Sequence, residues 1–362
     1  MLPMNRRRNE DTRMDAGGFA IAGRRIAADH AALVVAELGQ NHNGSLSLAE
    51  QLIDAAAWAG ADAIKLVKRD LDSELSREAR SRRYDSRHAF GATYGEHRQA
   101  LELSAYEHAL LAARAWRHGL IYIETACDIA SAAVLGELEV NAVKIASRDL
   151  KNLPLEYDEA SRGKPVILST GMAGLAEIDE AVDVVREAGP PFAVLQCTSL
   201  YPTPVGDVHL RSMVTLGSRY AVPVGFSDHT TGLLLAPVAV AMGAAIVEKH
   251  LTLDRSLKGT DHACSLEPDE FRQLVRQVRQ VETALGRADK PVAEGVATVR
   301  AKLGRSLVTR VPLAAGTRIE EPMLVLKCPG DGLSWLDRQR VVGRRLKRDL
   351  AADEKLKLED VF

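Results

Sequence analysis

The chain has 362 residues, of which 46% are hydrophobic and 27% charged, a composition typical of a globular protein with more than one domain. Its 47 basic and 49 acidic residues give a formal net charge of −2, which argues against non-specific nucleic-acid binding because that binding needs a basic surface. The longest apolar stretch, residues 232–247, is interrupted by Pro237 and Gly243 and is shorter than the ~20 residues that span a bilayer. We therefore expect a cytoplasmic protein with no nucleic-acid or membrane partner.

The four cysteines lie too far apart in the sequence to form a Cys-x-x-Cys motif, which argues against a zinc ribbon and a disulfide scaffold and favours a reducing compartment. Residues 1–18 combine an arginine run with acidic residues and contain no apolar segment of the kind found in secretory signals. We expect these residues to form a disordered tail.

Eight short β-rich apolar runs recur along the chain, and each ends in a polar residue. They are residues 34–37, 63–66, 121–125, 142–145, 165–169, 192–196, 222–227 and 245–250. A helical pattern follows each run, in residues 48–59, 101–116, 129–138, 149–161, 175–187, 207–218, 233–242 and 268–285. In the clearest helix, Ser47 and Glu50 are expected to form a capping box, and Gly60 ends it.

Eight β-then-α units predict a (β/α)8 TIM barrel over residues 19–286. A doubly wound open sheet is the alternative, but no glycine fingerprint follows the first apolar run. The second unit carries a long insertion, residues 70–96, of a size typical of lids and oligomer contacts. Residues 287–302 are expected to form a linker, and residues 303–362 a small β-rich domain.

Active sites of such barrels lie at the carboxyl ends of the strands, where this sequence places polar residues from eight segments. Two of them, Lys65 and Lys144, stand inside apolar runs. A buried ammonium group needs a partner, so two lysines beside several hydroxyl groups predict a bound anion such as a phosphate or carboxylate. The alternative is that each lysine extends past the strand end into solvent.

Two histidines, His229 and His250, follow the seventh and eighth apolar runs, which are neighbours in a barrel. They could share one divalent metal, with water or substrate in the open positions, or serve as structural hydrogen-bonding residues. Cys197 has no histidine paired with it in the sequence pattern, so we expect a buried structural thiol rather than a nucleophile.

Several motifs resemble the sialic acid synthase family, which condenses phosphoenolpyruvate with N-acetylmannosamine or its 6-phosphate. The motifs are residues 36–44 (AELGQNHNG), 144–147 (KIAS), 167–172 (ILSTGM), 196–202 (QCTSLYP), 225–230 (GFSDHT) and 248–250 (EKH). Residues 93–97 and 258–262 are most similar to the animal 9-phosphate branch, and residues 303–362 resemble the antifreeze-like (SAF) domain of this family. The resemblance implies a homodimer in which this domain is swapped onto the barrel mouth of the partner.

The resemblance also implies roles for individual residues. His229 and His250 would bind a divalent metal, Mn²⁺ or Mg²⁺. The phosphate and carboxylate of phosphoenolpyruvate would be held by Lys65, Thr125, Lys144, Ser147, Ser169, Ser199 and Ser227. Glu37 would transfer protons, and the acceptor sugar would be contacted by Asp149, Tyr201, Asp261 and, from the other subunit, Arg305. Among these, Glu37, Lys65, Lys144 and Asp261 form the expected catalytic group.

Two positions depart from the family pattern. Val67 stands where the family usually has a glutamine near the sugar, and Arg148 replaces a glycine beside Ser147. Arg148 and Lys68 could serve a phosphorylated acceptor or could point to solvent, which leaves both the free and the phosphorylated sugar open.

Three functions remain from the sequence. The first is a metal-dependent transferase that condenses phosphoenolpyruvate with an N-acylhexosamine or a related aldose. The second is a Schiff-base aldolase that uses Lys65 or Lys144, or another synthase that condenses phosphoenolpyruvate to a 2-keto sugar acid. The third is a non-catalytic carbohydrate-binding protein.

Overall fold

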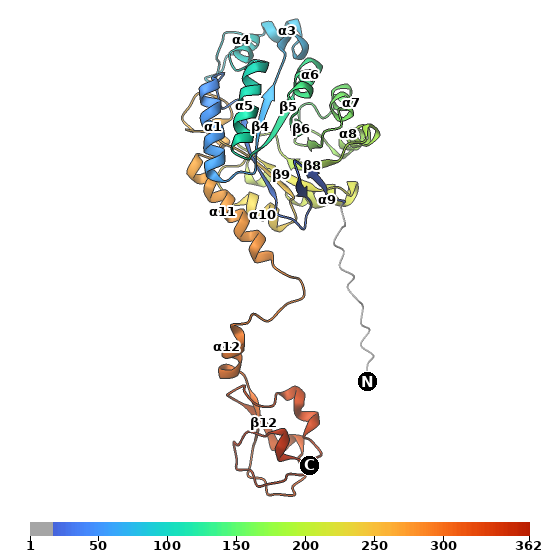
Figure 1. The fold of residues 1–362 in the computed structure, drawn as a ribbon, viewed down its shortest axis with the longest axis vertical. Helices are drawn as coiled ribbons and strands as arrows, with labels where there is room; N and C mark the ends of the chain where they lie inside the picture. The colour runs from blue at the N-terminus through green and yellow to red at the C-terminus, as the bar shows by residue number, and fades with distance from the viewer. Residues whose placement is uncertain (1–16) are drawn as a thin grey trace. The chain divides into compact units, whose positions relative to one another are not determined.

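The computed structural model describes residues 17–362 (Figure 1). The chain divides into two compact units, of which the first ends at Gly286 and the second runs from Arg287 to Phe362. Of the tail expected over residues 1–18, all but Gly17 and Gly18 lie outside the described residues.

The first unit is built on eight parallel strands that close into a barrel in the order β10-β3-β4-β5-β6-β7-β8-β9. The strands are β3 (Leu33–Gly39), β4 (Ala63–Lys68), β5 (Ile121–Ala126), β6 (Ala142–Ile145), β7 (Val166–Ser169), β8 (Phe192–Cys197), β9 (Val224–Asp228) and β10 (Ile246–His250). Helices surround the barrel (Figure 1), so the strands are buried on both faces, which explains their continuous apolar runs. The predicted TIM barrel is confirmed, and the open-sheet alternative is wrong because β10 pairs with β3.

A helix follows each barrel strand. The outer helices are α1 (Leu46–Ala59), α5 (Ala105–Arg117), α6 (Ile129–Glu137), α7 (Leu153–Ser161), α8 (Leu175–Ala188), α9 (Arg211–Tyr220), α10 (Leu235–Ala241) and α11 (Pro268–Leu285). The predicted capping box of the first helix is wrong: Ser45, two residues earlier than expected, is the N-cap and accepts a hydrogen bond from the backbone of Leu48. Gly60 ends this helix in the left-handed conformation, as the sequence predicts.

A hairpin that the sequence did not predict precedes the barrel. Strands β1 (Phe19–Ile21) and β2 (Arg24–Ile26) pair antiparallel. Their apolar side chains Phe19, Ile21 and Ile26 join a core cluster with the inward-facing residues at the amino ends of the barrel strands. The hairpin therefore closes the end of the barrel opposite to the strand ends where the polar residues lie.

The insertion that follows β4, residues 70–96, is folded. It contains two short helices, α2 (Leu71–Glu74) and α3 (Arg77–Ser81), and continues into α4 (Tyr94–Gln99). The ring of His97 stacks on Tyr84 at a centroid distance of 4.5 Å and on Phe90 at 5.9 Å. This aromatic cluster gives the insertion a small core of its own.

The second unit contains α12 (Val296–Leu303) and an antiparallel pair, β11 (Ser306–Thr309) and β12 (Leu324–Lys327). Its core is formed by Leu307, Leu313, Ile319, Leu324, Val341, Leu346, Leu350, Leu356 and Val361. Helix α12 occupies part of residues 287–302, where the sequence predicts only a linker. Short 3-10 helices complete the two units, at Val205–Asp207, His262–Cys264, Glu321–Met323, Trp335–Arg340 and Leu358–Asp360.

Residues 17–362 include no helix with the length and apolar composition that crossing a membrane requires. The cytoplasmic location stays a prediction.

Helix α7 buries two carboxyl groups, those of Glu156 and Glu159, whose oxygens have no hydrogen-bond partner among the described residues. Burial raises the pKa of each to about 8. Because their pKa in the unfolded chain is lower, the folded state holds these protons more tightly, and its stability falls as the pH rises towards 8.

We predict that Glu159→Gln has the wild-type free energy of unfolding at pH 5 and exceeds it at pH 8 by on the order of 2 kcal/mol, because glutamine cannot ionise. Urea denaturation at both pH values measures the difference. The matched control is Glu137→Gln on α6, whose side chain is exposed. An equal pH dependence in wild type and Glu159→Gln would contradict the prediction.

Candidate active site

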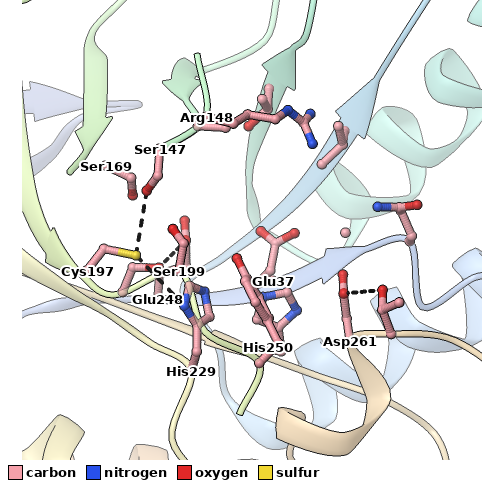
Figure 2. Close-up of a pocket in the computed structure, with 18 of the residues that line it drawn as sticks. Glu37, Ser147, Arg148, Ser169, Cys197, Ser199, His229, Glu248, His250 and Asp261 are labelled. Atoms are coloured by element: carbon pink, nitrogen blue, oxygen red, sulfur yellow. Dashed lines mark hydrogen bonds between the residues drawn. The ribbon is translucent and has the colours of Figure 1, made fainter. Parts of the chain in front are cut away.

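A cavity of about 530 Å³ opens at the carboxyl ends of the barrel strands. It brings together residues from all eight strand ends or the loops that follow them (Figure 2). The predicted site residues that line it are Glu37, Lys65, Thr125, Lys144, Ser147, Ser169, Ser199, Tyr201, Ser227, His229, His250 and Asp261. The two departures from the family pattern, Val67 and Arg148, line it as well.

The strand register explains why Glu37 lies between a lysine and a histidine. In the barrel, Glu37 on β3 is paired with Lys65 on β4 and with His250 on β10, so all three side chains point to the same face of the sheet. The Lys65 amine lies 2.6 Å from the Glu37 carboxylate, and both side chains are buried.

Burial has opposite effects on the two members of this pair. It raises the pKa of Glu37 to about 7, against the opposing attraction of Lys65. Burial alone would lower the pKa of Lys65, but the charges of Glu37 and Glu248 outweigh it and raise that pKa. The Lys65 amine is therefore held in its charged form inside the cavity.

The second buried lysine, Lys144, pairs with Glu248 at 3.2 Å, and the hydroxyl of Ser227 donates to the same carboxylate oxygen at 2.7 Å. Burial would raise the pKa of Glu248, but Lys144 and Lys65 outweigh it and lower that pKa to about 2. The sequence analysis missed Glu248 as a site residue. The sequence could have predicted it: side chains alternate between the two faces of a strand, so Glu248, two residues before His250, must share the face of this histidine.

Two hydroxyl groups of the cavity lack partners. The Oγ1 atom of Thr125 and the Oγ atom of Ser169 are buried and have no hydrogen-bond partner among the described residues. By contrast, Ser147 accepts a hydrogen bond from the backbone N–H of Gly171 at 2.9 Å. Buried hydroxyls are rarely left unpaired, so Thr125 and Ser169 are available to a ligand in the cavity.

His229 and His250 lie side by side, with ring centroids 5.3 Å apart. Nδ1 of His229 lies 3.0 Å from the carbonyl oxygen of Thr198, and donation to this oxygen would leave Nε2 as the unprotonated nitrogen. Nδ1 of His250 is buried with no hydrogen-bond partner among the described residues, and burial lowers the pKa of this ring, which keeps it neutral. Neutral imidazoles are the form that binds metal ions.

The two histidines form a fitting but incomplete metal site. Across residues 17–362, no group of three or more His, Cys, Asp or Glu side chains is arranged to hold an ion. A divalent cation at His229 and His250 would therefore take its remaining ligands from water or substrate, as an open catalytic site does.

Of the expected sugar contacts, Tyr201 and Asp261 line the cavity, whereas Asp149 and Arg305 do not. Tyr201 lies over His229 with a centroid distance of 4.2 Å, and Asp261 accepts a hydrogen bond from Thr260 at 2.7 Å. Asp149 does not line the cavity and pairs with Arg148 at 3.2 Å. Arg305 belongs to the second unit, where it donates to the backbone carbonyl of Leu303 at 2.7 Å.

A buried ion pair on the outer face of the sheet supports the histidines. Lys249 and Asp228 are fully buried, with the Lys249 amine 2.9 Å from the Asp228 carboxylate. Each residue directly precedes one of the two histidines in the sequence: Asp228 precedes His229, and Lys249 precedes His250. The ion pair therefore connects the carboxyl ends of β9 and β10, next to the two histidines.

Comparison with known proteins identifies the family of this chain. The sequence pattern of the NeuB family matches residues 52–290, and that of the SAF domain matches residues 304–361. The chain belongs to the NeuB family.

Relatives of this NeuB-family chain include N-acetylneuraminate-9-phosphate synthase of Mus musculus, 37% identical over 306 residues that cover 84% of this chain and 85% of the mouse protein. N,N'-diacetyllegionaminic acid synthase of Legionella pneumophila is 37% identical over 334 residues, which cover 91% and 94% of the two chains. The crystal structure of N-acetylneuraminic acid synthetase from Leptospira borgpetersenii is similar with a TM-score of 0.69 and 33% identity, covering 78% of this chain and 94% of that one.

We predict that Lys249→Met destabilises this NeuB-family chain by about 3–5 kcal/mol, because Asp228 is left buried without its partner. The double variant Lys249→Met/Asp228→Leu should recover most of this loss, since no charge then stays buried alone. Urea denaturation measures both. A double variant as unstable as the single one would show that packing, and not the ion pair, is responsible.

Proposed function

We propose that this chain condenses phosphoenolpyruvate with an N-acylhexosamine such as N-acetylmannosamine, forming a sialic acid or its 9-phosphate and inorganic phosphate. One observation carries the proposal: two buried lysines and two unpaired hydroxyls share a single cavity with two adjacent imidazoles. The names of the mouse, Legionella and Leptospira relatives, all synthases of sialic or legionaminic acids, support it.

In this proposal the lysine side of the cavity binds phosphoenolpyruvate. The two ammonium groups stabilise its phosphate and carboxylate, and the hydroxyls of Thr125 and Ser169 gain the partners they lack. The other proposed contacts are Ser147, Ser199 and Ser227. The lysines also stabilise the phosphate as it leaves.

The balanced reaction joins C3 of phosphoenolpyruvate to the aldehyde carbon of the sugar. The aldehyde oxygen takes up a proton and becomes a hydroxyl group, and water adds to C2 with loss of one proton. The bond between C2 and the bridging oxygen then breaks, the C2 hydroxyl gives up its proton as the ketone forms, and inorganic phosphate leaves with the bridging oxygen and takes up this proton. Glu37 is the proposed acceptor of the water proton, because its carboxylate faces the same space as Lys65.

His229 and His250 are the proposed holders of a divalent cation, Mn²⁺ or Mg²⁺. When bound, such a cation would polarise the aldehyde oxygen of the acceptor as a Lewis acid. Asp261 and Tyr201 line the cavity beside the two imidazoles and are the proposed contacts of the sugar, with Asp261 as a catalytic group.

We further propose a homodimer in which the second unit of one chain brings Arg305 to the sugar at the barrel of the other, where Asp149 is the remaining proposed sugar contact. Exposed apolar side chains support a docked second unit, since Val299 and Leu303 on α12 are more than half exposed. Apolar residues are also exposed next to the cavity, among them Met172 and Leu200.

The charge state of Lys65 argues against a Schiff-base aldolase that uses this lysine. Imine formation needs an uncharged amine, whereas the neighbouring carboxylates raise the pKa of this lysine. The assay that separates all three functions measures phosphate release. Release that needs both phosphoenolpyruvate and an N-acylhexosamine supports the proposal, and release that is missing with every acceptor would contradict it.

We predict that His229→Ala and His250→Ala each lower phosphate release by at least ~100-fold and abolish Mn²⁺ binding measured by calorimetry, because each removes one of two protein ligands. Chelation of the wild-type protein should have the same effect. The matched control is His118→Ala on the exposed end of α5. Full activity in either site variant would remove the metal assignment.

We predict that Lys144→Gln raises the KM for phosphoenolpyruvate by about 10–100-fold, because a charge-assisted contact of about 1.5–3 kcal/mol is lost. Glutamine can still donate to Glu248, so the fold is expected to persist. Steady-state kinetics measure the KM, with the exposed Lys151→Gln as the control. An unchanged KM and kcat in Lys144→Gln would contradict the anion site.

A further inference from the structure

The cavity holds a second group of basic side chains that the proposed reaction does not yet use. Arg69, Arg87, Arg98 and Arg148 all line it together with the two lysines. Two of them, Arg87 and Arg98, come from the insertion and its last helix, α4. We call these four residues the arginine group.

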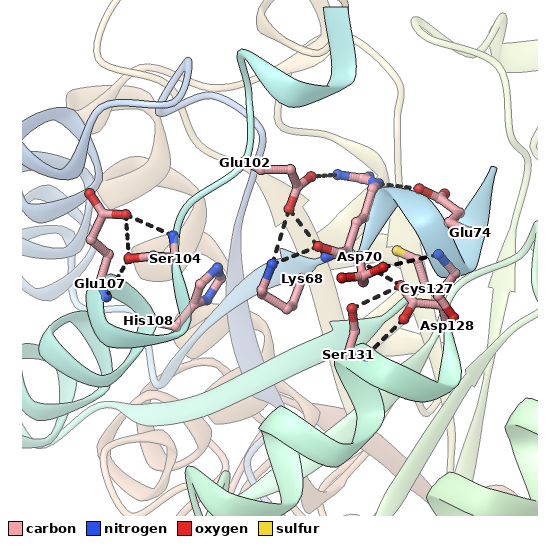
Figure 3. Close-up of polar contacts among 12 residues, drawn as sticks. Lys68, Asp70, Glu74, Glu102, Ser104, Glu107, His108, Cys127, Asp128 and Ser131 are labelled. Carbon is pink, nitrogen blue, oxygen red and sulfur yellow. Dashed lines mark hydrogen bonds and ion pairs between the residues drawn. The ribbon is translucent and has the colours of Figure 1, made fainter. Parts of the chain in front are cut away.

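Two members of the arginine group are already neutralised. Arg69 is buried and pairs with Glu102 at 3.0 Å and with Glu74 at 3.5 Å, two acids that are labelled in Figure 3. Arg148 pairs with Asp149 at 3.2 Å. Their charges are largely balanced by carboxylates of the protein.

Arg98 is different, because its partners are neutral. Its Nη1 donates to the side-chain oxygen of Gln40 at 2.7 Å, and its Nε and Nη2 donate to the hydroxyl of Tyr94 at 2.8 and 2.6 Å. Among residues 17–362, no carboxylate forms an ion pair with Arg98 or with Arg87, whose Nε donates to His88. Neither guanidinium group is thus paired directly with a carboxylate, and Asp261, which feels the charge of Arg98, lines the same cavity.

The protein holds Arg98 in place. Thr93 and Glu96 form a capping box at the start of α4, and the Arg98 guanidinium lies over the Tyr94 ring at 5.0 Å. Besides burial, the charges of Arg98, Arg69 and Lys258 lower the pKa of His97 to about 4, so positive charge gathers around this helix. A cation fixed in this way by neutral groups is preorganised for an anion from outside the chain.

The anion at Arg98 is distinct from phosphoenolpyruvate in this account. The phosphate and carboxylate of phosphoenolpyruvate already have the two lysines and the unpaired hydroxyls of Thr125 and Ser169. The cavity of about 530 Å³ has room for a second substrate. Guanidinium groups suit phosphate because they form paired, charge-assisted hydrogen bonds with its oxygens.

We propose that Arg98, with Arg87, binds a phosphate group carried by the acceptor sugar, so that the preferred acceptor is a hexosamine phosphate. This inference rests on the proposed condensation and names the substrate class of the same site. The relatives do not decide it, since their names include a 9-phosphate synthase and a diacetyllegionaminic acid synthase.

The test compares N-acetylmannosamine with its 6-phosphate, at saturating phosphoenolpyruvate and Mn²⁺, in wild type and Arg98→Gln. Wild type should prefer the phosphorylated sugar in kcat/KM. In Arg98→Gln this preference should fall by about 10–100-fold, the loss expected for a charge-assisted contact. Arg98→Lys should recover part of it, because the charge returns without the planar fork.

The matched control is Arg83→Gln, an exposed arginine of the same insertion that pairs with Asp85 and does not line the cavity. Equal losses for both acceptors in Arg98→Gln, or a shift in the KM for phosphoenolpyruvate instead, would overturn the inference. A wild type that prefers the free sugar would overturn it too and leave the proposed condensation standing. If neither sugar supports phosphate release, both the inference and the proposed condensation are contradicted.

Discussion

The active-site cavity depends on charges that are buried in pairs. An isolated ammonium inside a barrel would lose its proton or destabilise the fold, whereas each buried lysine of the cavity has a carboxylate partner, Glu37 for Lys65 and Glu248 for Lys144. The cavity therefore holds its two lysine amines at fixed positions among buried side chains. Electrostatic stabilisation is strongest under these conditions, since little reorganisation is needed when an anion binds.

The rest of the barrel places these charged side chains at one end. Its amino end is filled with apolar side chains and closed by the β1–β2 hairpin, so the polar residues collect at the opposite end. The parallel register aligns Glu37 with Lys65 and with His250. The outer ion pair of Asp228 and Lys249 then fixes the two strands that carry the histidines. The insertion adds arginines to the same cavity, and their charges differ in how far the protein neutralises them.

Much of the fold could be predicted from the sequence because strands buried on both faces leave long apolar runs and each run ends where the site begins. The β1–β2 hairpin was missed because its strands have three residues each, too few to show a period. The first helix starts at Ser45 and not Ser47, since two serines at alternate positions offer the same capping chemistry. The segment between α3 and α4 packs on His97 through Tyr84 and Phe90, aromatic contacts that sequence spacing does not reveal.

Within the site, the sequence motifs identified most of the residues, but they did not predict which side chains form ion pairs with one another. Lys65 and Lys144 were recognised as buried cations, but their partners depend on which strands are neighbours and on the register between them. Glu248 follows from the two-residue period of β10, whereas Arg98 reaches the cavity only through the fold of the insertion. Long-range placement of this kind is a property of tertiary structure.

The most direct test of the account is a crystal structure with Mn²⁺ and phosphoenolpyruvate, using anomalous scattering to locate the metal. We predict a manganese peak bound by the side chains of His229 and His250, with the phosphate and carboxylate of phosphoenolpyruvate on the amines of Lys65 and Lys144. A manganese peak elsewhere, or phosphoenolpyruvate bound away from both amines, would contradict the account.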